Sequence, residues 1–272
     1  MNRPQPLAQA DLGKVRAVFA DVDGTLTTDG RLTSTVLRAI EWLVAHRVQV
    51  VLVSGRPSGW GESWIRQLPV AGVIVENGAL AWARESKGLK KRYAQSAPVR
   101  AQNRARLTRI VTAAMGKVKG SLLSTDSLAR EVDLAIDYAE DARLGPQGAD
   151  ALESFLVARG VTAVRSSVHV NCWIGQFDKR SAVRDFLFRQ WKVRLRPVDP
   201  RFVYVGDSFN DAPMFAAFSL SVAVANVLDV IDRLDAPPKF ITRAREGRGF
   251  CELVDAIARS QKARPKAERV AS

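Results

Sequence analysis

The chain has 272 residues, enough for one large domain or two smaller ones, and its 47% apolar and 25% charged residues are typical of a globular protein with a substantial core. A net charge of +13 is typical of a solvated basic surface or of a protein with an anionic partner, which can be nucleic acid, a membrane surface or a phosphorylated small molecule. Two widely separated cysteines and two histidines argue against a disulfide framework and against a cysteine or histidine metal site. The sequence shows no leader and no apolar run of membrane-spanning length, so we expect a cytoplasmic protein.

The first part of the chain alternates between predicted strands and helices. Residues 15–20 form an apolar run that ends at Asp21 and the sequence DVDGTLT. The next apolar strand stops at Ser54-Gly55-Arg56-Pro57, and a third ends at Glu76-Asn77-Gly78. Helical spacing separates these strands, so the order predicts a parallel sheet with right-handed crossovers. The strands are predicted at 15–20, 48–53 and 72–75, and the helices at 35–45 and 60–68.

The pattern changes between residues 83 and 173. Two helical stretches each open with a proline, which suits a first helical turn. One segment alternates like a half-buried strand, and another is either one strand or a hairpin. We interpret this part as a separate α+β insert, with helices at 98–115 and 146–159 and strands at 130–138 and 163–174.

After residue 175 the first pattern resumes. Asp178 is placed to cap an amphipathic helix that begins at Lys179, and a later strand ends in Gly206-Asp207. The elements are predicted at 179–191, 202–205, 212–218, 221–224, 239–242 and 250–259. We therefore expect a doubly wound, Rossmann-like α/β core from residues 1–83 and 175–260, an inserted α+β cap over 84–174, and a disordered basic tail over 261–272.

Polar residues follow several of the predicted core strands. In an open parallel sheet the carboxyl ends of the strands meet at one edge, where ligands bind. Carboxylates crowded there repel one another unless a cation neutralises them, and Mg²⁺ prefers oxygen ligands. The sequence therefore predicts a site for a divalent cation such as Mg²⁺ at this edge. The polar residues at the strand ends are Asp21, Asp23, Ser54, Glu76, Asn77, Asp207, Asn210 and Asp211, and Lys179 opens the helix after the insert.

Four ordered motifs carry a resemblance to a known family. They are Asp21-Val22-Asp23-Gly24-Thr25-Leu26, Ser54-Gly55-Arg56, Lys179, and Gly206-Asp207-Ser208-Phe209-Asn210-Asp211. In this order and spacing they resemble the haloacid dehalogenase-like hydrolase superfamily, and the insert is similar to the cap of its Cof-type (subfamily IIB), sugar-phosphatase-like branch. Asp23 with Gly24-Thr25 favours phosphate esters over carbon–halogen bonds, because dehalogenating members generally lack this second aspartate.

The resemblance implies a role for each motif. Asp21 is expected to attack phosphorus and form an aspartyl-phosphate, while Asp23 acts as general acid and then general base. Mg²⁺ is expected on the Asp21 carboxylate, the Asp23 carbonyl and the Asp207 carboxylate, with Asp211 in its outer shell. The phosphoryl group is expected to be bound by Ser54, Lys179, Gly24 and Asn210.

Substrate contacts are less defined by the sequence. His169, Asn171 and Trp173 alternate on one face of the last predicted cap strand, so they either line the cavity or pack on helices. Arg56 and Asn77 are further candidates at the ends of core strands.

The expected function is Mg²⁺-dependent hydrolysis of a phosphate monoester, with a small phosphorylated metabolite such as a sugar phosphate as substrate. One alternative is a phosphomutase, which shares the same motifs. Another is a nucleic-acid-binding protein with a silent site, although the sequence contains no RNA- or DNA-binding motif. Oligomeric state is left open.

Overall fold

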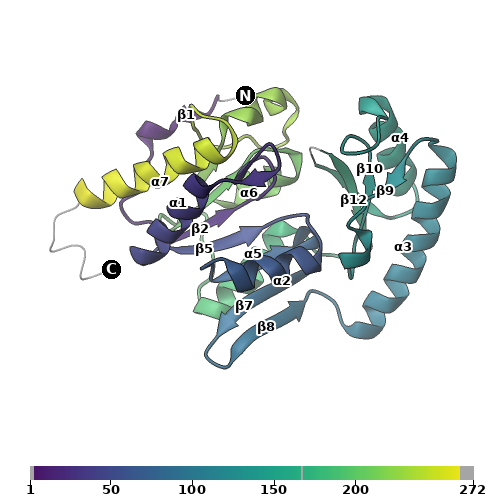
Figure 1. Cartoon of the computed structure of the whole chain (residues 1–272), viewed down its shortest axis with the longest axis horizontal. Coiled ribbons are helices and arrows are strands. Elements are labelled where there is room, and N and C mark those ends of the chain that lie inside the picture. Colours follow the sequence, from purple (N-terminus) through teal and green to yellow (C-terminus); the bar gives the residue numbers. More distant parts are fainter. Residues whose placement is uncertain (1–2, 167, 264–272) are drawn as a thin grey trace.

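The computed structural model describes residues 3–166 and 168–263, which fold into a large and a small β-sheet, each flanked by helices (Figure 1). Within these residues the large sheet has nine strands. Their spatial order is β1 (Gln5–Pro6), β15 (Phe240–Ile241), β14 (Leu220–Ala223), β13 (Phe202–Gly206), β2 (Ala17–Ala20), β5 (Gln49–Val53), β6 (Gly72–Val75), β7 (Leu80–Glu85) and β8 (Gly88–Tyr93). The strands from β1 to β6 run parallel, and β7 and β8 continue the sheet as an antiparallel pair.

Helices cover both faces of the large sheet, which confirms the predicted doubly wound α/β architecture. Along β2, Val18 and Ala20 pack into one apolar cluster, whereas Ala17 and Phe19 pack into another, because successive strand residues point to opposite faces. The first cluster lies under α1 (Ser34–Ala45), α2 (Ser58–Gln67) and α7 (Glu246–Ala263). The second lies under α5 (Lys179–Trp191) and α6 (Ala212–Ala217).

The small sheet lies beside the large one, at the right of Figure 1, and is antiparallel throughout. Its order is β11 (Thr162–Arg165), β12 (His169–Trp173), β10 (Leu134–Asp137) and β9 (Leu122–Leu123). Val170 and Cys172 point from β12 into a third apolar cluster, which α3 (Ala97–Lys117) and α4 (Gly145–Val157) complete. The described residues also contain the hairpin β3 (Thr27–Thr28) and β4 (Arg31–Leu32), and the 3₁₀ turns η1 (Leu7–Gln9), η2 (Glu76–Gly78), η3 (Ser127–Ala129), η4 (Phe209–Asp211), η5 (Ala225–Asp229) and η6 (Ile231–Arg233).

Three sequence-based boundaries need correction. The expected limit of the core at residue 83 falls inside β7, and β7 and β8 both pair within the large sheet, so we place the start of the insert after Tyr93. Residues 130–133 of the expected strand lie outside β10, because their backbone is bound elsewhere. Helix α7 continues to Ala263, so residues 261–263 of the expected disordered tail are helical; residues 264–272 lie outside the described residues.

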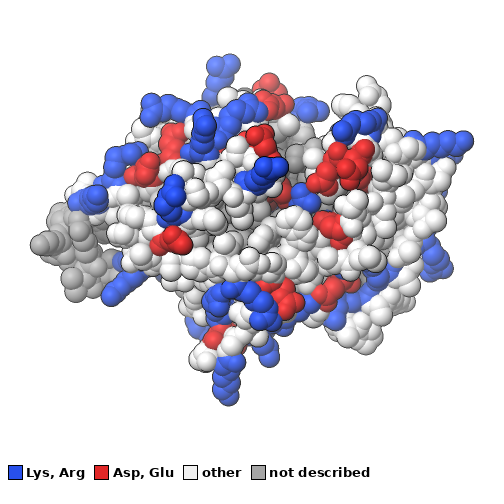
Figure 2. Space-filling model, in the orientation of Figure 1, with Lys and Arg blue, Asp and Glu red and all other residues white. Residues whose placement is uncertain are grey.

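Basic side chains do not gather in a single patch on the face shown in Figure 2, where Lys and Arg alternate with Asp and Glu over both parts of the protein. Within the described residues, no helix combines the length and the apolar character that crossing a bilayer would require.

Glu76 joins the insert to the large sheet. It follows β6, is fully buried, and has a left-handed backbone with a φ of 49°. Its two carboxylate oxygens accept hydrogen bonds from the backbone N–H groups of Glu131, Val132 and Asp133, at 2.7–3.0 Å, and from that of Ser58 at 2.9 Å. Four N–H donors on a buried carboxylate form a strong, charge-assisted contact that fixes residues 131–133 against the core.

We predict that Glu76→Gln destabilises the protein, because the new amide group would point its own N–H donors at backbone N–H groups. The free energy of unfolding should fall by about 2–4 kcal/mol, measured from the urea midpoint. Glu62→Gln is the matched control, since Glu62 is only partly buried on α2 and pairs with Arg66 one turn away; it should cost about 0.5 kcal/mol or less. Equal losses in the free energy of unfolding for the two variants would contradict the proposed contribution of the Glu76 hydrogen bonds.

Candidate active site

The strands β2, β5 and β13 end side by side, and each is followed by a polar residue of the predicted site. The parallel registers pair Ala20 with Leu52 on one side and with Val205 on the other. Asp21, Ser54 and Asp207 therefore emerge at the same edge of the sheet, and all three are buried. The order of apolar strands in the sequence is what brings these distant residues together.

Lys179 is the buried cation of the site. Its Nζ lies 2.7 Å from Asp21 Oδ1 and 2.7 Å from Asp211 Oδ1. The residue begins α5, whose start is fixed by the cap residue Asp178, which accepts a hydrogen bond from Ser181 N at 2.6 Å. Gly78 allows this helix start to approach η2, since a Cβ at Gly78 would lie 2.2 Å from the Asp178 carbonyl oxygen.

Asp211 is held by four donors. Its Oδ1 accepts from Lys179 and from the hydroxyl of Tyr204, which lies within β13. Its Oδ2 accepts from the backbone N–H groups of Asp207, at 2.9 Å, and Ser208, at 3.1 Å. Asp211 thereby orients both the lysine and the loop that carries Asp207.

Asp207 lies against the loop after β2. Thr25 Oγ1 donates to its Oδ1 at 2.9 Å, and Asn226 Nδ2 donates to its Oδ2 at 2.9 Å. Gly24 has a φ of 75°, and a Cβ there would lie 2.6 Å from Asp207 Oδ2. Glycine is therefore required at this position both for its backbone angle and for the close approach of the two loops.

Burial and mutual repulsion shift the pKa values of these groups. Burial raises the pKa of Asp21 to about 8, although Lys179 lowers it, and Asp211 and Asp23 raise it further. Burial, together with Asp21 and Asp211, also raises the pKa of Asp207 well above its ordinary value. Burial alone would lower the pKa of Lys179, but Asp21 and Asp211 hold it above the usual range. The site is therefore short of positive charge, since one lysine faces several carboxylates.

The donor set fits a hard divalent cation such as Mg²⁺. One carboxylate oxygen from each of Asp21, Asp207 and Asp211 lies within 4.8 Å of the others, and all three residues are buried. Oxygen donors with surplus negative charge are the ligands that Mg²⁺ prefers. Asp211 already accepts four hydrogen bonds, so the carboxylate oxygens of Asp21 and Asp207 have more lone pairs left to bind a cation. The Asp23 carboxylate is outside this cluster.

A cavity adjoins this cluster on the side of the insert. Asp21 and Asp23 line it from the large sheet, and His169 and Asn171 line it from β12, as the alternation along that strand predicts. Arg56 Nε donates to both Asp23 oxygens, at 3.1 and 3.0 Å, and the same guanidinium pairs with Asp126 and Glu140 of the insert. Arg130, Ser208 and Asn210 also line the cavity.

His169 faces the carboxylate of Glu140, with Nε2 and Oε2 2.9 Å apart. Burial lowers the pKa of His169, and the nearby Glu140 opposes this effect only in part. A buried histidine that favours its neutral form can accept or donate a hydrogen bond with the cavity.

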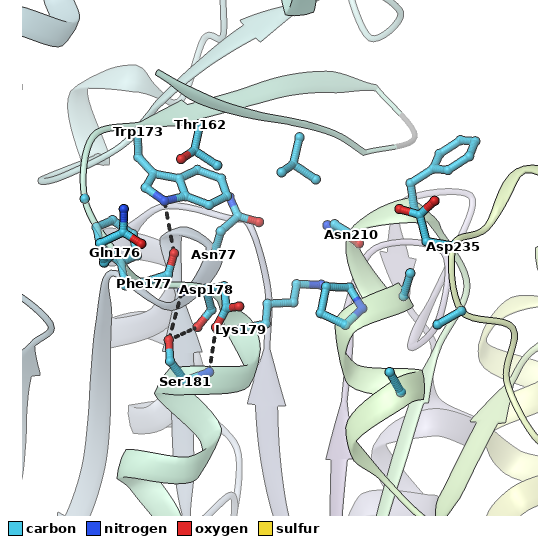
Figure 3. A pocket seen from close by; sticks show the side chains of 17 residues that line it. Asn77, Thr162, Trp173, Gln176, Phe177, Asp178, Lys179, Ser181, Asn210 and Asp235 are labelled. Atoms are coloured by element: carbon cyan, nitrogen blue, oxygen red, sulfur yellow. Dashed lines mark hydrogen bonds between the residues drawn. The ribbon is translucent and has the colours of Figure 1, made fainter. Parts of the chain in front are cut away.

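The remaining predicted residues lie close by. Ser54 Oγ accepts from Arg56 N at 3.0 Å, and Asn77 Nδ2 donates to Asp133 at 3.2 Å. Trp173 Nε1 donates to the Phe177 carbonyl, and its indole lines a separate pocket of about 670 Å³ (Figure 3). Asn77, Lys179 and Asn210 also line that pocket. Asn77 lies on the same side as Trp173, and Asn210 lies opposite them. Trp173 therefore does not share the cavity of His169 and Asn171.

Sequence reasoning missed several contributors. Tyr204 is hidden within an apolar strand, and Asn226 stands alone after a short one. Asp126 and Glu140 contact Arg56 only because the insert folds back onto the core. Only Tyr204 carried a local signal, since a tyrosine buried in a central strand needs a partner for its hydroxyl.

Comparisons with known proteins agree with this fold. Residues 18–116 match the family described as haloacid dehalogenase-like hydrolase. No curated protein matches the sequence. Among solved structures, a Thermoplasma acidophilum protein has a TM-score of 0.70 at 20% identity, over 90% of this chain and 98% of that one.

Two further structures carry named activities. A sugar phosphatase of subclass IIB of the same superfamily has a TM-score of 0.62 at 17% identity, over 90% of this chain and 99% of that one. The C-terminal domain of C. albicans trehalose-6-phosphate phosphatase has a TM-score of 0.68 at 15% identity, over 96% of this chain and 99% of that domain. At these identities the likeness concerns the fold.

The matched segment contains the first two motifs, from Asp21 to Arg56, and the fold brings Lys179 and Asp207 to the same sheet edge. Residues 18–116 are therefore similar to the family of haloacid dehalogenase-like hydrolases, and the solved structures extend the likeness in fold to most of the chain.

Proposed function

We propose that the protein is a Mg²⁺-dependent phosphatase that hydrolyses a small phosphate monoester through an aspartyl-phosphate on Asp21. The observation that carries this proposal is the convergence of Asp21, Asp207 and Lys179 beside a cavity that also contains Asp23. Asp21 supplies a nucleophile, Lys179 a fixed positive charge, and Asp23 a carboxyl group on the open side.

In the first step an Asp21 carboxylate oxygen attacks phosphorus and the bond from phosphorus to the leaving oxygen breaks. Lys179 binds Asp21 Oδ1, which leaves Oδ2 as the attacking atom. Asp23, two residues further along the same loop, gives its proton to the leaving alcohol. The products of this step are the free alcohol and the aspartyl-phosphate.

In the second step water attacks the same phosphorus. Asp23, now ionised, takes a proton from that water, and the bond between phosphorus and Asp21 breaks to release inorganic phosphate. Both carboxyl groups thereby return to their starting states. A bound Mg²⁺, held by the Asp21 and Asp207 carboxylates and the Asp23 carbonyl with Asp211 behind them, would neutralise phosphoryl charge and orient the group.

The phosphoryl oxygens would be bound by donors around Asp21. Ser54 is buried, and its oxygen accepts from Arg56 N. Its hydroxyl proton has no acceptor among the residues that the structure describes, so it can donate to a phosphoryl oxygen. Lys179, Asn210 and the backbone at Gly24 complete this set. Fixed donors of this kind stabilise the charge that moves onto the phosphoryl oxygens in the transition state.

For the leaving group we propose a sugar or sugar-like alcohol. Arg56, His169 and Asn171 line the cavity on the side of Asp23, where the leaving oxygen must lie to receive a proton. These polar groups suit a hydroxylated substrate. The names of two structural relatives, a sugar phosphatase and a trehalose-6-phosphate phosphatase, support the same class. Asn77 and Trp173 are further substrate contacts if the leaving group reaches the adjoining pocket.

We predict that Asp21→Asn lowers phosphate release by at least about 10³-fold, because the amide is a poor nucleophile. The measurement is inorganic phosphate released from a panel of sugar phosphates with Mg²⁺, and again with EDTA, which should abolish release. Asp29→Asn, an exposed change of the same kind on the same loop, is the control and should keep full activity. Transfer of phosphate between sugar hydroxyls without net release would instead identify a phosphomutase.

Asp23→Asn should separate the two chemical steps. With p-nitrophenyl phosphate the leaving group needs no proton, so the variant should release a burst of about one nitrophenol per site and then turn over slowly. With an alkyl phosphate the whole reaction should fall by about 10²–10⁴-fold. A rate with p-nitrophenyl phosphate that falls without a burst would remove Asp23 from the water-activation step.

A further inference from the structure

Asn226 contacts three segments beside the edge of the sheet that carries Asp207: the turn at Gly24, the loop at Asp207 and the start of α7 at Glu246. It belongs to η5, which follows β14, the strand beside β13. The backbone on each side is fixed, since Val224 N donates to the Gly206 carbonyl and Ala225 N donates to the Ala244 carbonyl, both at 3.1 Å. The Asn226 side chain therefore starts from a constrained position beside the loop that carries Asp207.

The amide of Asn226 uses both of its ends. Its Nδ2 donates to the Gly24 carbonyl at 3.0 Å and to Asp207 Oδ2 at 2.9 Å, while its Oδ1 accepts from Glu246 N at 2.9 Å. The orientation of the amide is unambiguous, because two acceptors face one end and a backbone N–H faces the other. Its nitrogen, a donor that cannot ligate a cation, is the atom that faces Asp207.

These contacts fix the two loops relative to each other. Thr25 and Asn226 each bind one oxygen of Asp207, so the plane of that carboxylate is set from both sides. The bond to the Gly24 carbonyl anchors the turn that directly follows Asp23. Without Asn226, the Asp207 carboxylate would keep only Thr25 as a side-chain partner among the described residues, and the Gly24 turn would lose its link to η5.

We propose that Asn226 is a positioning residue for the divalent cation, which it serves by orienting Asp207 and the Asp23–Gly24 turn without binding the cation itself. This inference rests on the proposed metal-dependent function. Hydrogen-bond partners behind metal ligands typically contribute ten- to hundredfold to metal affinity. Removal of the Asn226 amide is therefore expected to raise the Mg²⁺ dissociation constant by about that factor.

The test is Mg²⁺ binding by isothermal titration calorimetry without substrate, on the unaltered protein, Asn226→Leu and Asn226→Ala. Leucine keeps the size of the side chain and removes its hydrogen bonds, and alanine serves if leucine does not fit. Asn103→Leu is the matched control, because Asn103 is also half-buried and donates to the Ile174 carbonyl at 3.1 Å, within the insert. Urea midpoints measured on all four proteins show how much stability each change costs.

We expect a ten- to hundredfold weaker Mg²⁺ affinity for both Asn226 variants and an unchanged affinity for Asn103→Leu, even at equal loss of stability. The kcat of the Asn226 variants should recover largely at saturating Mg²⁺. Unchanged affinity in folded Asn226 variants would overturn this inference and leave the proposed function intact. Absence of Mg²⁺ binding by the unaltered protein would overturn the proposed function and this inference together.

Discussion

The charge balance around Lys179 is the constraint on which the site depends. Asp21, Asp207 and Asp211 bring three carboxylates into a buried space, and Lys179 supplies one positive charge. When all three are ionised, two negative charges remain, which is the charge that one divalent cation neutralises. Burial of unpaired charge is costly, and therefore the pKa values of Asp21 and Asp207 are raised in the protein without a metal. Three carboxylates beside one lysine are therefore suited to hold a divalent cation.

The site is divided into a closed half and an open half. On the closed side Lys179, Asp211 and Tyr204 are buried and bound mainly to each other and to backbone groups. On the open side Asp23 and Arg56 face the cavity, and Arg56 pairs with Asp23 and with Asp126 of the insert. Under the proposed function, the closed half and Asp21 carry out the attack on phosphorus, and the open half supplies the proton transfers of Asp23 and the contacts to the leaving group.

Much of this arrangement could be predicted because the motifs coincide with strand ends. Asp21, Ser54 and Asp207 each follow an apolar run, and parallel strands bring such ends together without knowledge of the tertiary structure. The sequence of β8, with Lys90, Lys91 and Arg92, is typical of a solvated loop, so its place in the large sheet was missed. An edge strand needs few apolar residues, and the pairing of β8 with β7 cannot be predicted from the local sequence pattern alone.

Contacts between the insert and the core were the least predictable part of the structure. Glu76 was recognised only as a polar residue at a strand end, yet its carboxylate binds three consecutive N–H groups of the insert. Arg130, fully buried, adds a bond to the Gly55 carbonyl beside Ser54. Opening the insert like a lid would remove three of the four N–H donors of the Glu76 carboxylate and the bond from Arg130 to the Gly55 carbonyl, at a cost of several kcal/mol. Under the proposed function, substrate selection depends on the shape and charge of a cavity whose insert side is bound to the large sheet through Glu76 and Arg130.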